Sequence, residues 1–384
     1  MNRKQFLVLI IALLVLGSAG LVLNWQDIAA YRASGARIGA KLLPEFRIAD
    51  VAEIRLQDAK NQVTLARKEN AWVVQERDGY TANFQEIGDL MVKLLELKVT
   101  QSEQVVASLL PRLELGEPAK VGDAAEPRRG EGAGTLVEFK DSTGKPLARL
   151  ILGKKVLKKD PLNPLPSAQD GVPAGRYVLP ASARDTVVVV SDPLNGAEAG
   201  PGKWLNKEFF TAERIKTLAV APEGGVPRWK IARDVEYGQW KFAGGGGRLD
   251  ARAAVAAVNK LGTMTFSDVA VNLRQQDTEK PVIAVAETFD NLTYTVKVAR
   301  KTKGDDAFVS FTLAGNPPRE RVPEKGEKAQ DKERRDKEFA ESLKKLEERV
   351  AREKALAQWT YVVAKRELEP LLKERGDMVA KQKK

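Results

Sequence analysis

The sequence predicts an α+β protein in which an N-terminal transmembrane helix precedes two tandem repeats of one unit, each a mostly antiparallel sheet with a covering helix. Three observations favour this class. Short runs of alternating apolar and polar residues are separated by turn residues. Each half of the chain holds one amphipathic helical segment, and the two halves align over the same series of elements.

The repeat begins with a matching pair of first strands. Residues 46–56 read FRIADVAEIRL and residues 210–220 read FTAERIKTLAV, so that a Phe leads each segment and apolar residues recur at the same positions. Hairpins follow at 63–74 and 229–242, and their second strands carry Trp72 and Trp240. The agreement in order and spacing indicates one structural unit used twice.

A helix follows the hairpin in each half, over residues 83–97 and 250–261. Asp250 is of a residue type that caps helix N-termini. Both segments repeat apolar residues at helical spacing, namely Ile87, Leu90, Leu94 and Leu97 in the first and Val255, Val258 and Leu261 in the second.

Four further pairs of strands complete the alignment. A Tyr is expected to begin the last strand of each half, at Tyr177 and Tyr361. The other pairs are 97–101 with 264–271, 135–139 with 282–289, and 146–153 with 292–299.

The domain organisation follows from the repeat. We expect a membrane anchor at 1–25, a linker at 26–45, a first repeat at 46–195, a junction at 196–209, and a second repeat at 210–384 that carries a charged helical insertion at 316–357.

Composition excludes much of catalytic chemistry. The chain of 384 residues contains neither cysteine nor histidine, which removes disulfides, thiol nucleophiles, zinc sites with Cys or His ligands, and Ser-His-Asp triads. No catalytic motif is evident, so we expect a protein that is not an enzyme and has no cofactor or metal. The net charge of +11 is spread along the chain rather than gathered on one element, which does not favour a nucleic-acid partner.

The N-terminal segment predicts insertion in a lipid bilayer. An uncharged run extends from Phe6 to Leu23, with Arg3 and Lys4 before it and Trp25 where an interfacial aromatic belongs. The residues predicted to face lipid are Phe6, Leu9, Leu13, Leu16 and Leu23. The alternative is a signal peptide cleaved after Ala19. In both cases the chain beyond about residue 30 would lie outside the cytoplasm.

The stretch PGKWLNKEFF at 201–210 sets aromatic residues among lysines. Because Phe210 aligns with Phe46, this stretch marks the junction, and we expect Trp204 and Phe209 to pack the halves together while Lys203 and Lys207 face water. The alternative is a ligand pocket at this junction, lined by Trp204, Lys207, Phe209 and Phe210.

The insertion at 316–357 reads as a long charged helix. Phe339, Leu343, Leu346 and Val350 repeat at 4, 3, 4 spacing, which is typical of a coiled-coil seam. This row either packs back on its own domain or binds a helix of a partner.

A glycine run precedes the second helix, at Gly244–Gly247. Glycine loops at helix N-termini can hold phosphate, but the spacing matches no phosphate-binding motif, so we interpret the run as a connector.

The chain resembles the DUF4340 family, a domain of unknown function. The resemblance is carried by NAWVVQERDGYTANFQEIGDLMVKLLELKVTQSE at 70–103 and PGKWLNKEFF at 201–210, and it covers most of residues 40–315. These motifs are structural. The resemblance implies an accessory component of an ABC transporter of the gliding-motility type, held in a bacterial inner membrane with its bulk in the periplasm. The insertion at 316–357 departs from the family pattern.

The sequence therefore leaves two functional hypotheses. The first is a non-catalytic, membrane-anchored scaffold or accessory subunit whose partner is a membrane complex. The second is a periplasmic protein that binds a glycan or another small ligand at the junction.

Overall fold

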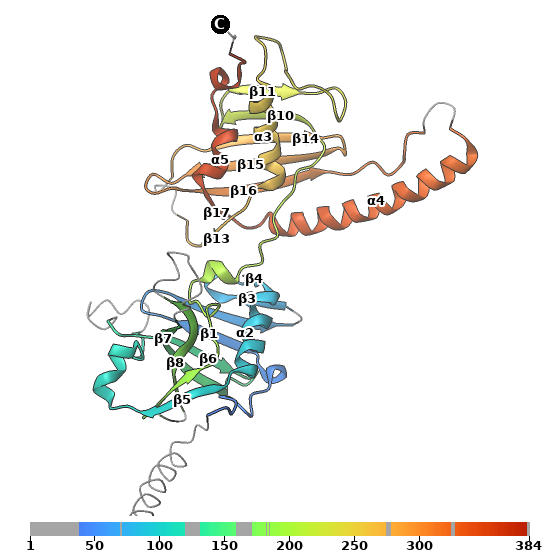
Figure 1. The fold of residues 1–384 in the computed structure, drawn as a ribbon. Helices are drawn as coiled ribbons and strands as arrows, with labels where there is room; N and C mark the ends of the chain where they lie inside the picture. The colour runs from blue at the N-terminus through green and yellow to red at the C-terminus, as the bar shows by residue number, and fades with distance from the viewer. Residues whose placement is uncertain are drawn as a thin grey trace, which may run out of the picture. The chain divides into compact units, whose positions relative to one another are not determined.

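The structure is a computed structural model, and it describes residues 38–69, 71–119, 131–158, 171–181, 183, 185–273, 278–323 and 327–381. The chain divides into two compact units, of which the first ends at Trp204 and the second begins at Leu205. Each unit contains one antiparallel sheet and few helices (Figure 1). The predicted anchor at 1–25 lies outside the described residues. None of the helices in the described ranges has both the length and the apolar character needed to cross a bilayer.

The first unit is built on a sheet of nine strands in the order β4-β3-β2-β1-β6-β7-β8-β9-β5. Its strands are β1 (Glu53–Gln57), β2 (Gln62–Lys68), β3 (Ala71–Val74), β4 (Tyr80–Thr81), β5 (Val99–Gln104), β6 (Thr135–Lys140), β7 (Pro146–Lys158), β8 (Val172–Pro180) and β9 (Thr186–Val190). Short 3-10 turns connect them: η1 (Ile48–Asp50), η2 (Gln75–Arg77), η3 (Ala107–Leu113) and η6 (Pro201–Trp204).

Helix α2 (Phe84–Glu96) lies against one face of this sheet (Figure 1). Asn83 caps it, because its side-chain oxygen accepts from the backbone N–H groups of Gln85 and Glu86. The helix buries Ile87, Leu90 and Leu94 of the predicted row, and Leu97 is buried at its C-cap; Met91, which the prediction did not include, is buried as well. The inner face of the sheet is apolar as well, since Ile54 pairs with Leu65 and Phe139.

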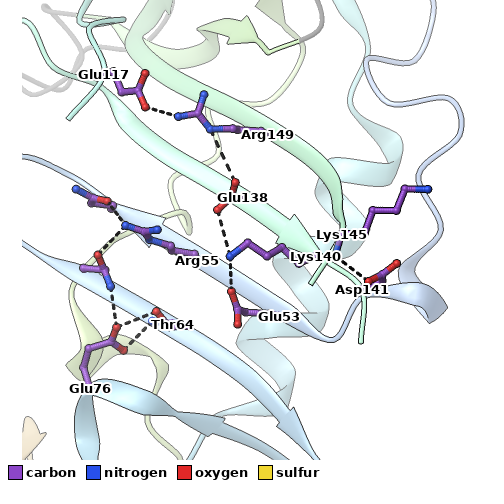
Figure 2. Close-up of polar contacts among 12 residues, drawn as sticks. Glu53, Arg55, Thr64, Glu76, Glu117, Glu138, Lys140, Asp141, Lys145 and Arg149 are labelled. Atoms are coloured by element: carbon purple, nitrogen blue, oxygen red, sulfur yellow. Dashed lines mark hydrogen bonds and ion pairs between the residues drawn. The ribbon is translucent and has the colours of Figure 1, made fainter. Parts of the chain in front are cut away.

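The opposite, outer face of the first sheet has two parts. Over β2, β1 and β6 it carries a polar row, in which Lys140 Nζ donates to Glu53 at 2.9 Å and lies 3.6 Å from Glu138 (Figure 2). Over β7, β8 and β9 it is apolar, and residues 105–119, here called the cover, lie on it. The buried cluster beneath consists of Leu115, Leu136, Ile151, Leu179 and Val187.

Polar contacts tie the cover to the sheet. Arg149 of β7 pairs with Glu117 of the cover, as Figure 2 shows, and Gln57 Nε2 donates to the carbonyl of Ala119 at 2.6 Å. Close approach also requires Gly153, because a Cβ there would collide with the carbonyl oxygen of Leu113 and the side chain of Leu115.

The second unit is built on a sheet of eight strands in the order β12-β11-β10-β14-β15-β16-β17-β13. Its strands are β10 (Ile215–Pro222), β11 (Trp229–Ala232), β12 (Lys241–Phe242), β13 (Asp268–Val269), β14 (Val282–Thr288), β15 (Leu292–Arg300), β16 (Asp306–Gly315) and β17 (Tyr361–Ala364). Its helices are α3 (Ala251–Thr263), α4 (Ala329–Leu356), α5 (Lys365–Leu372) and the 3-10 turn η8 (Arg375–Met378).

The strand orders of the two sheets coincide when β10 is set against β1. From there β11 and β12 match β2 and β3, β13 matches β5, and β14 to β17 match β6 to β9. The register agrees too, because Ile54 pairs with Leu65 and Phe139 while Leu218, at the same offset, pairs with Ile231 and Ala286. Asp250 caps α3 as Asn83 caps α2.

Two sequence predictions need correction here. The equivalence of Tyr177 and Tyr361 is wrong, because Tyr177 lies in β8 whereas Tyr361 begins β17, the counterpart of β9. A Tyr-Val pair suits any buried strand, so it did not distinguish neighbouring strands. The first strands also begin later than predicted: Phe46 and Phe210 precede β1 and β10 and pack as buried side chains.

Candidate functional site: the arm formed by helix α4

Helix α4 extends away from the sheet of the second unit as a projecting arm (Figure 1). Residues 316–323 run out alongside it before the helix returns, and Arg321 pairs with Asp336 of the helix at 2.8 Å. The same Arg321 lies 2.7 Å from Glu327, which precedes the helix. Ion pairs therefore join the two sides of the arm near its tip.

The predicted apolar row lies along α4 in a graded way. Val350 is buried, whereas Phe339, Leu343 and Leu346 are half-buried. Among the α4 side chains that the structure describes, only Val350 and Glu353 are buried. The helix is thus packed into its unit at its C-terminal end, while most of its length presents charged side chains to solvent.

A buried carboxylate holds the base of the arm. Glu353, 2% exposed, accepts a hydrogen bond from the hydroxyl of Tyr294 at 2.7 Å and one from the backbone N–H of Thr211 at 3.0 Å. Arg349, one turn earlier, lies 3.9 Å from the Glu353 carboxylate and pairs with Glu213. These contacts join α4 to β15 and to the segment before β10.

Burial sets the electrostatics of this base. It raises the pKa of Glu353, an effect that the hydrogen bonds from Tyr294 and Thr211 oppose. Burial and the hydrogen bond to Glu353 also raise the pKa of Tyr294, so its hydroxyl stays a donor at all physiological pH values.

The aromatic residues predicted at the junction lie in two places. Trp204 belongs to the first unit, where its ring is buried and its Nε1 donates to the carbonyl of Glu198 at 2.8 Å. Phe209 and Phe210 belong to the second unit. Their rings join an aromatic cluster with Tyr294, Phe311, Phe266 and Tyr361.

The lysines of the junction stretch make specific contacts. Lys203 lies 3.8 Å from Glu86 and 3.6 Å from Glu198. Lys207 donates to the carbonyl of Ser267 at 3.0 Å, and its Nζ lies 4.9 Å from the centre of the Phe266 ring. Lys207 is exposed, as predicted, although its Nζ contacts the protein. Lys203 is half-buried, which departs from the prediction that it faces water.

Within the second unit, Phe210 of the junction stretch lies close to the C-terminal end of the predicted α4 row, at the base of the arm. Phe210 packs against Tyr294, with 6.0 Å between ring centres, and Tyr294 binds Glu353 directly after the row that ends at Val350. Sequence reasoning missed Glu353, Tyr294 and Arg349. A signal was present, because Glu353 follows Val350 by three residues and so occupies the next position of the 4-3 pattern.

The glycine run before α3 offers carbonyl oxygens rather than a phosphate cradle. The guanidinium of Arg375 donates to the carbonyls of Gly245 and Gly246 at 2.9 and 3.0 Å. In the described ranges, no cluster of acidic side chains is arranged to hold a metal ion.

Comparisons of the chain with protein-family models, with curated proteins and with solved structures give no match. The arm offers a half-buried apolar row flanked by charges, and its buried Glu353 accepts hydrogen bonds that hold the helix in place. Apolar area surrounded by charges is the composition of protein contact surfaces.

Proposed function

We propose that this protein is a non-catalytic, membrane-anchored scaffold or accessory subunit whose α4 arm binds a partner protein. The observation that carries the proposal is the arm itself. A helix of 28 residues that is buried only near its C-terminal end leaves several turns available to another protein.

The surface of the arm suits a specific, reversible contact. Leu343 and Leu346 supply apolar area, and acidic and basic residues alternate around them. Apolar area at the centre of a contact contributes affinity, while the surrounding charges select the partner and its orientation. Since two heptads are too short for a stable isolated coiled coil, the partner would have to contribute further surface.

The membrane part of the proposal depends on the sequence. The apolar segment from Phe6 to Leu23 supports an anchor, and the resemblance to the DUF4340 family supports an ABC transporter complex as the partner. In this proposal the two described units lie on the periplasmic side of a bacterial inner membrane. The repeated strand order supports two copies of one α+β unit as the body that carries the arm.

Site-specific photo-crosslinking in membranes tests the partner. A photoreactive residue at Lys344, exposed on α4, is expected to form an adduct with a membrane protein. The matched control is Lys241, which is exposed on β12. Equal labelling at both positions, or none at Lys344, would contradict the proposal.

Two further measurements separate the arm from the anchor. Leu343→Asp combined with Leu346→Asp should abolish co-purification of the crosslinked protein while the chain stays in the membrane fraction. Carbonate extraction tests the anchor by itself, and full release of the unprocessed chain by carbonate would refute a transmembrane segment.

A further inference from the structure

The second unit contains a cleft of about 390 Å³ that plays no part in the proposed arm contact. Residues 211–215 form one wall, α3 forms another with Val255, Val258 and Asn259, and Trp240 and Arg233 complete the lining. Its volume falls within the range of about 300–1,000 Å³ that is usual for small-ligand sites.

Helix α3 carries smaller side chains than α2 at two positions of the cleft lining. When the two helices are aligned from their caps, Gly262 stands where α2 has Leu95, and Asn259 stands where α2 has Val92. A Cβ on Gly262 would lie 3.3 Å from the carbonyl oxygen of Ala212, in the cleft wall. The absence of a side chain at Gly262 therefore lets α3 pass close to this wall, at a position that a Leu occupies in the first unit.

The charged side chains of the lining are already paired. Arg214 pairs with Asp290 and Glu236, and Glu213 pairs with Arg349. Arg233 donates to the backbone carbonyls of Ile215 and Glu236. The cleft therefore offers no unpaired charge for an ionic ligand among these groups.

The polar groups that stay available are neutral. Within the described part of the chain, neither the indole Nε1 of Trp240 nor the side-chain amide of Asn259 has a hydrogen-bond partner in the protein. The Trp240 ring is held in place by Arg233, whose guanidinium carbon lies 4.9 Å from the ring centre. The cleft thus combines a fixed flat ring, a neutral amide and aliphatic walls.

We propose that this cleft binds one uncharged pyranose unit of an oligosaccharide. A pyranose presents an apolar face of C–H groups, which matches an indole ring, and a rim of hydroxyls that both donate and accept. An amide side chain has the same dual capacity. An anionic ligand would find the arginines already paired, whereas the hydroxyls of a neutral sugar can pair with the Asn259 amide at the rim of the cleft.

The test uses the purified full-length chain in detergent with three uncharged trisaccharides, namely chitotriose, maltotriose and cellotriose. Trigalacturonate serves as the charged comparator. Calorimetry and saturation-transfer NMR should detect binding of at least one uncharged trisaccharide, and Trp240→Ala should weaken that binding about tenfold, as expected for the loss of one good aromatic contact.

Two variants keep the test independent of folding. Asn259→Val, which installs the α2 residue at an exposed helix position, should weaken binding without lowering the melting temperature. Tyr237→Ala is the matched control, since Tyr237 is 93% exposed and lies outside the cleft lining. Absence of binding to all three uncharged sugars, binding of trigalacturonate alone, or equal affinity in wild type and Trp240→Ala would overturn the proposal.

Discussion

The outer faces of the two sheets differ at positions that the strand register makes equivalent. In the first unit, Leu136, Ile151, Leu179 and Val187 lie buried beneath the cover. Following the pairing outward from β1 and β10, the same positions in the second unit are Ile283, Lys297, Ser310 and Thr360. There the face carries an open hollow of about 630 Å³, whose lining includes Lys297, Ser310 and Thr360.

The difference shows that one strand order can support two different surfaces. Apolar residues on the outer face require a cover, because exposing them to water costs about 25 cal/mol per Å². At three of the four positions the second unit has a polar residue, namely Lys297, Ser310 and Thr360, which removes most of that requirement. The close contact of the cover also constrains the strand beneath it, since Gly153 meets the cover whereas Ala299 occupies the equivalent position in the second unit.

The helices that cover the inner faces of the two sheets differ in the size of their buried side chains. Leu90 of α2 corresponds to Ala257 of α3, and both are buried. A helix of small residues can approach its sheet more closely than one lined with Leu, so each helix is fitted to its own sheet. Exchanging residues between equivalent positions therefore tests the comparison directly.

The largest effect on stability is expected when Ile151 and Lys297 are each replaced by the residue found at the equivalent position of the other unit. Ile151→Lys places a charge under the cover at a position that is 7% exposed, which should destabilise the first unit by about 3–5 kcal/mol. Lys297→Ile loses only an exposed ion pair with Glu223 and should cost at most about 1 kcal/mol. Hydrogen exchange resolved by unit measures both, and similar losses in the two variants would show that the outer faces do not differ as described.

A somewhat smaller effect is expected from the helix exchange. Leu90→Ala should destabilise the first unit by about 2–5 kcal/mol, because it leaves a cavity under α2. Ala257→Leu should destabilise the second unit by about 1–3 kcal/mol through overpacking. Thermal unfolding of each variant, followed by hydrogen exchange in each unit, checks both values. A stabilising Ala257→Leu would mean that α3 has unused space over the sheet.

Adding a methyl group to the strand beneath the cover should lower the stability of the first unit moderately. Gly153→Ala forces the cover away from β7 and should cost about 1–3 kcal/mol. Faster proteolysis within residues 105–119 is the expected readout. The reverse change at the equivalent position, Ala299→Gly, should cost only about 0.5–1 kcal/mol. Unchanged proteolysis in Gly153→Ala would contradict close packing of the cover.

An effect of similar size but confined to the second unit is expected at the base of the arm, which has no counterpart among the described residues of the first unit. Glu353→Ala leaves the Tyr294 hydroxyl and the Thr211 N–H without their partner, at a cost of about 1–3 kcal/mol. Hydrogen exchange should rise in α4 and stay unchanged in the first unit. Protection of α4 equal to wild type would show that Glu353 does not hold the arm.

Glu353 should also make the stability of the second unit depend on pH. Because burial raises the pKa of Glu353 above its ordinary 4.5, the folded state binds the proton more tightly than the unfolded state. Its contribution to stability therefore grows as pH falls through the raised pKa and is complete below 4.5. Glu353→Gln should remove this gain, so its stability in mild acid should rise less than that of wild type; an identical pH profile would contradict the assignment.

The sequence by itself determined the mixed α and β class with antiparallel sheets, the order of the elements, the two helices and the Asp250 cap. Apolar periodicity and turn residues act locally, so α2, α3 and the hairpins could be placed from them. The predicted buried row of α3 is wrong, however, because Val255 is 45% exposed and the helix buries Ala253, Ala254 and Ala257 beside Leu261. The sequence also determined the apolar row of α4, because the 4-3 spacing of that row depends on the helix alone.

Tertiary structure decided which side chains meet. Tyr294, Thr211 and Glu353 lie far apart in the chain, and only the packing of α4 against β15 makes them one hydrogen-bonded group. The cover over Ile151 and the cleft beside Gly262 likewise depend on distances between elements. A single sequence records the polarity and size of each residue, whereas contacts between distant segments arise only when strand register and helix packing bring those residues together.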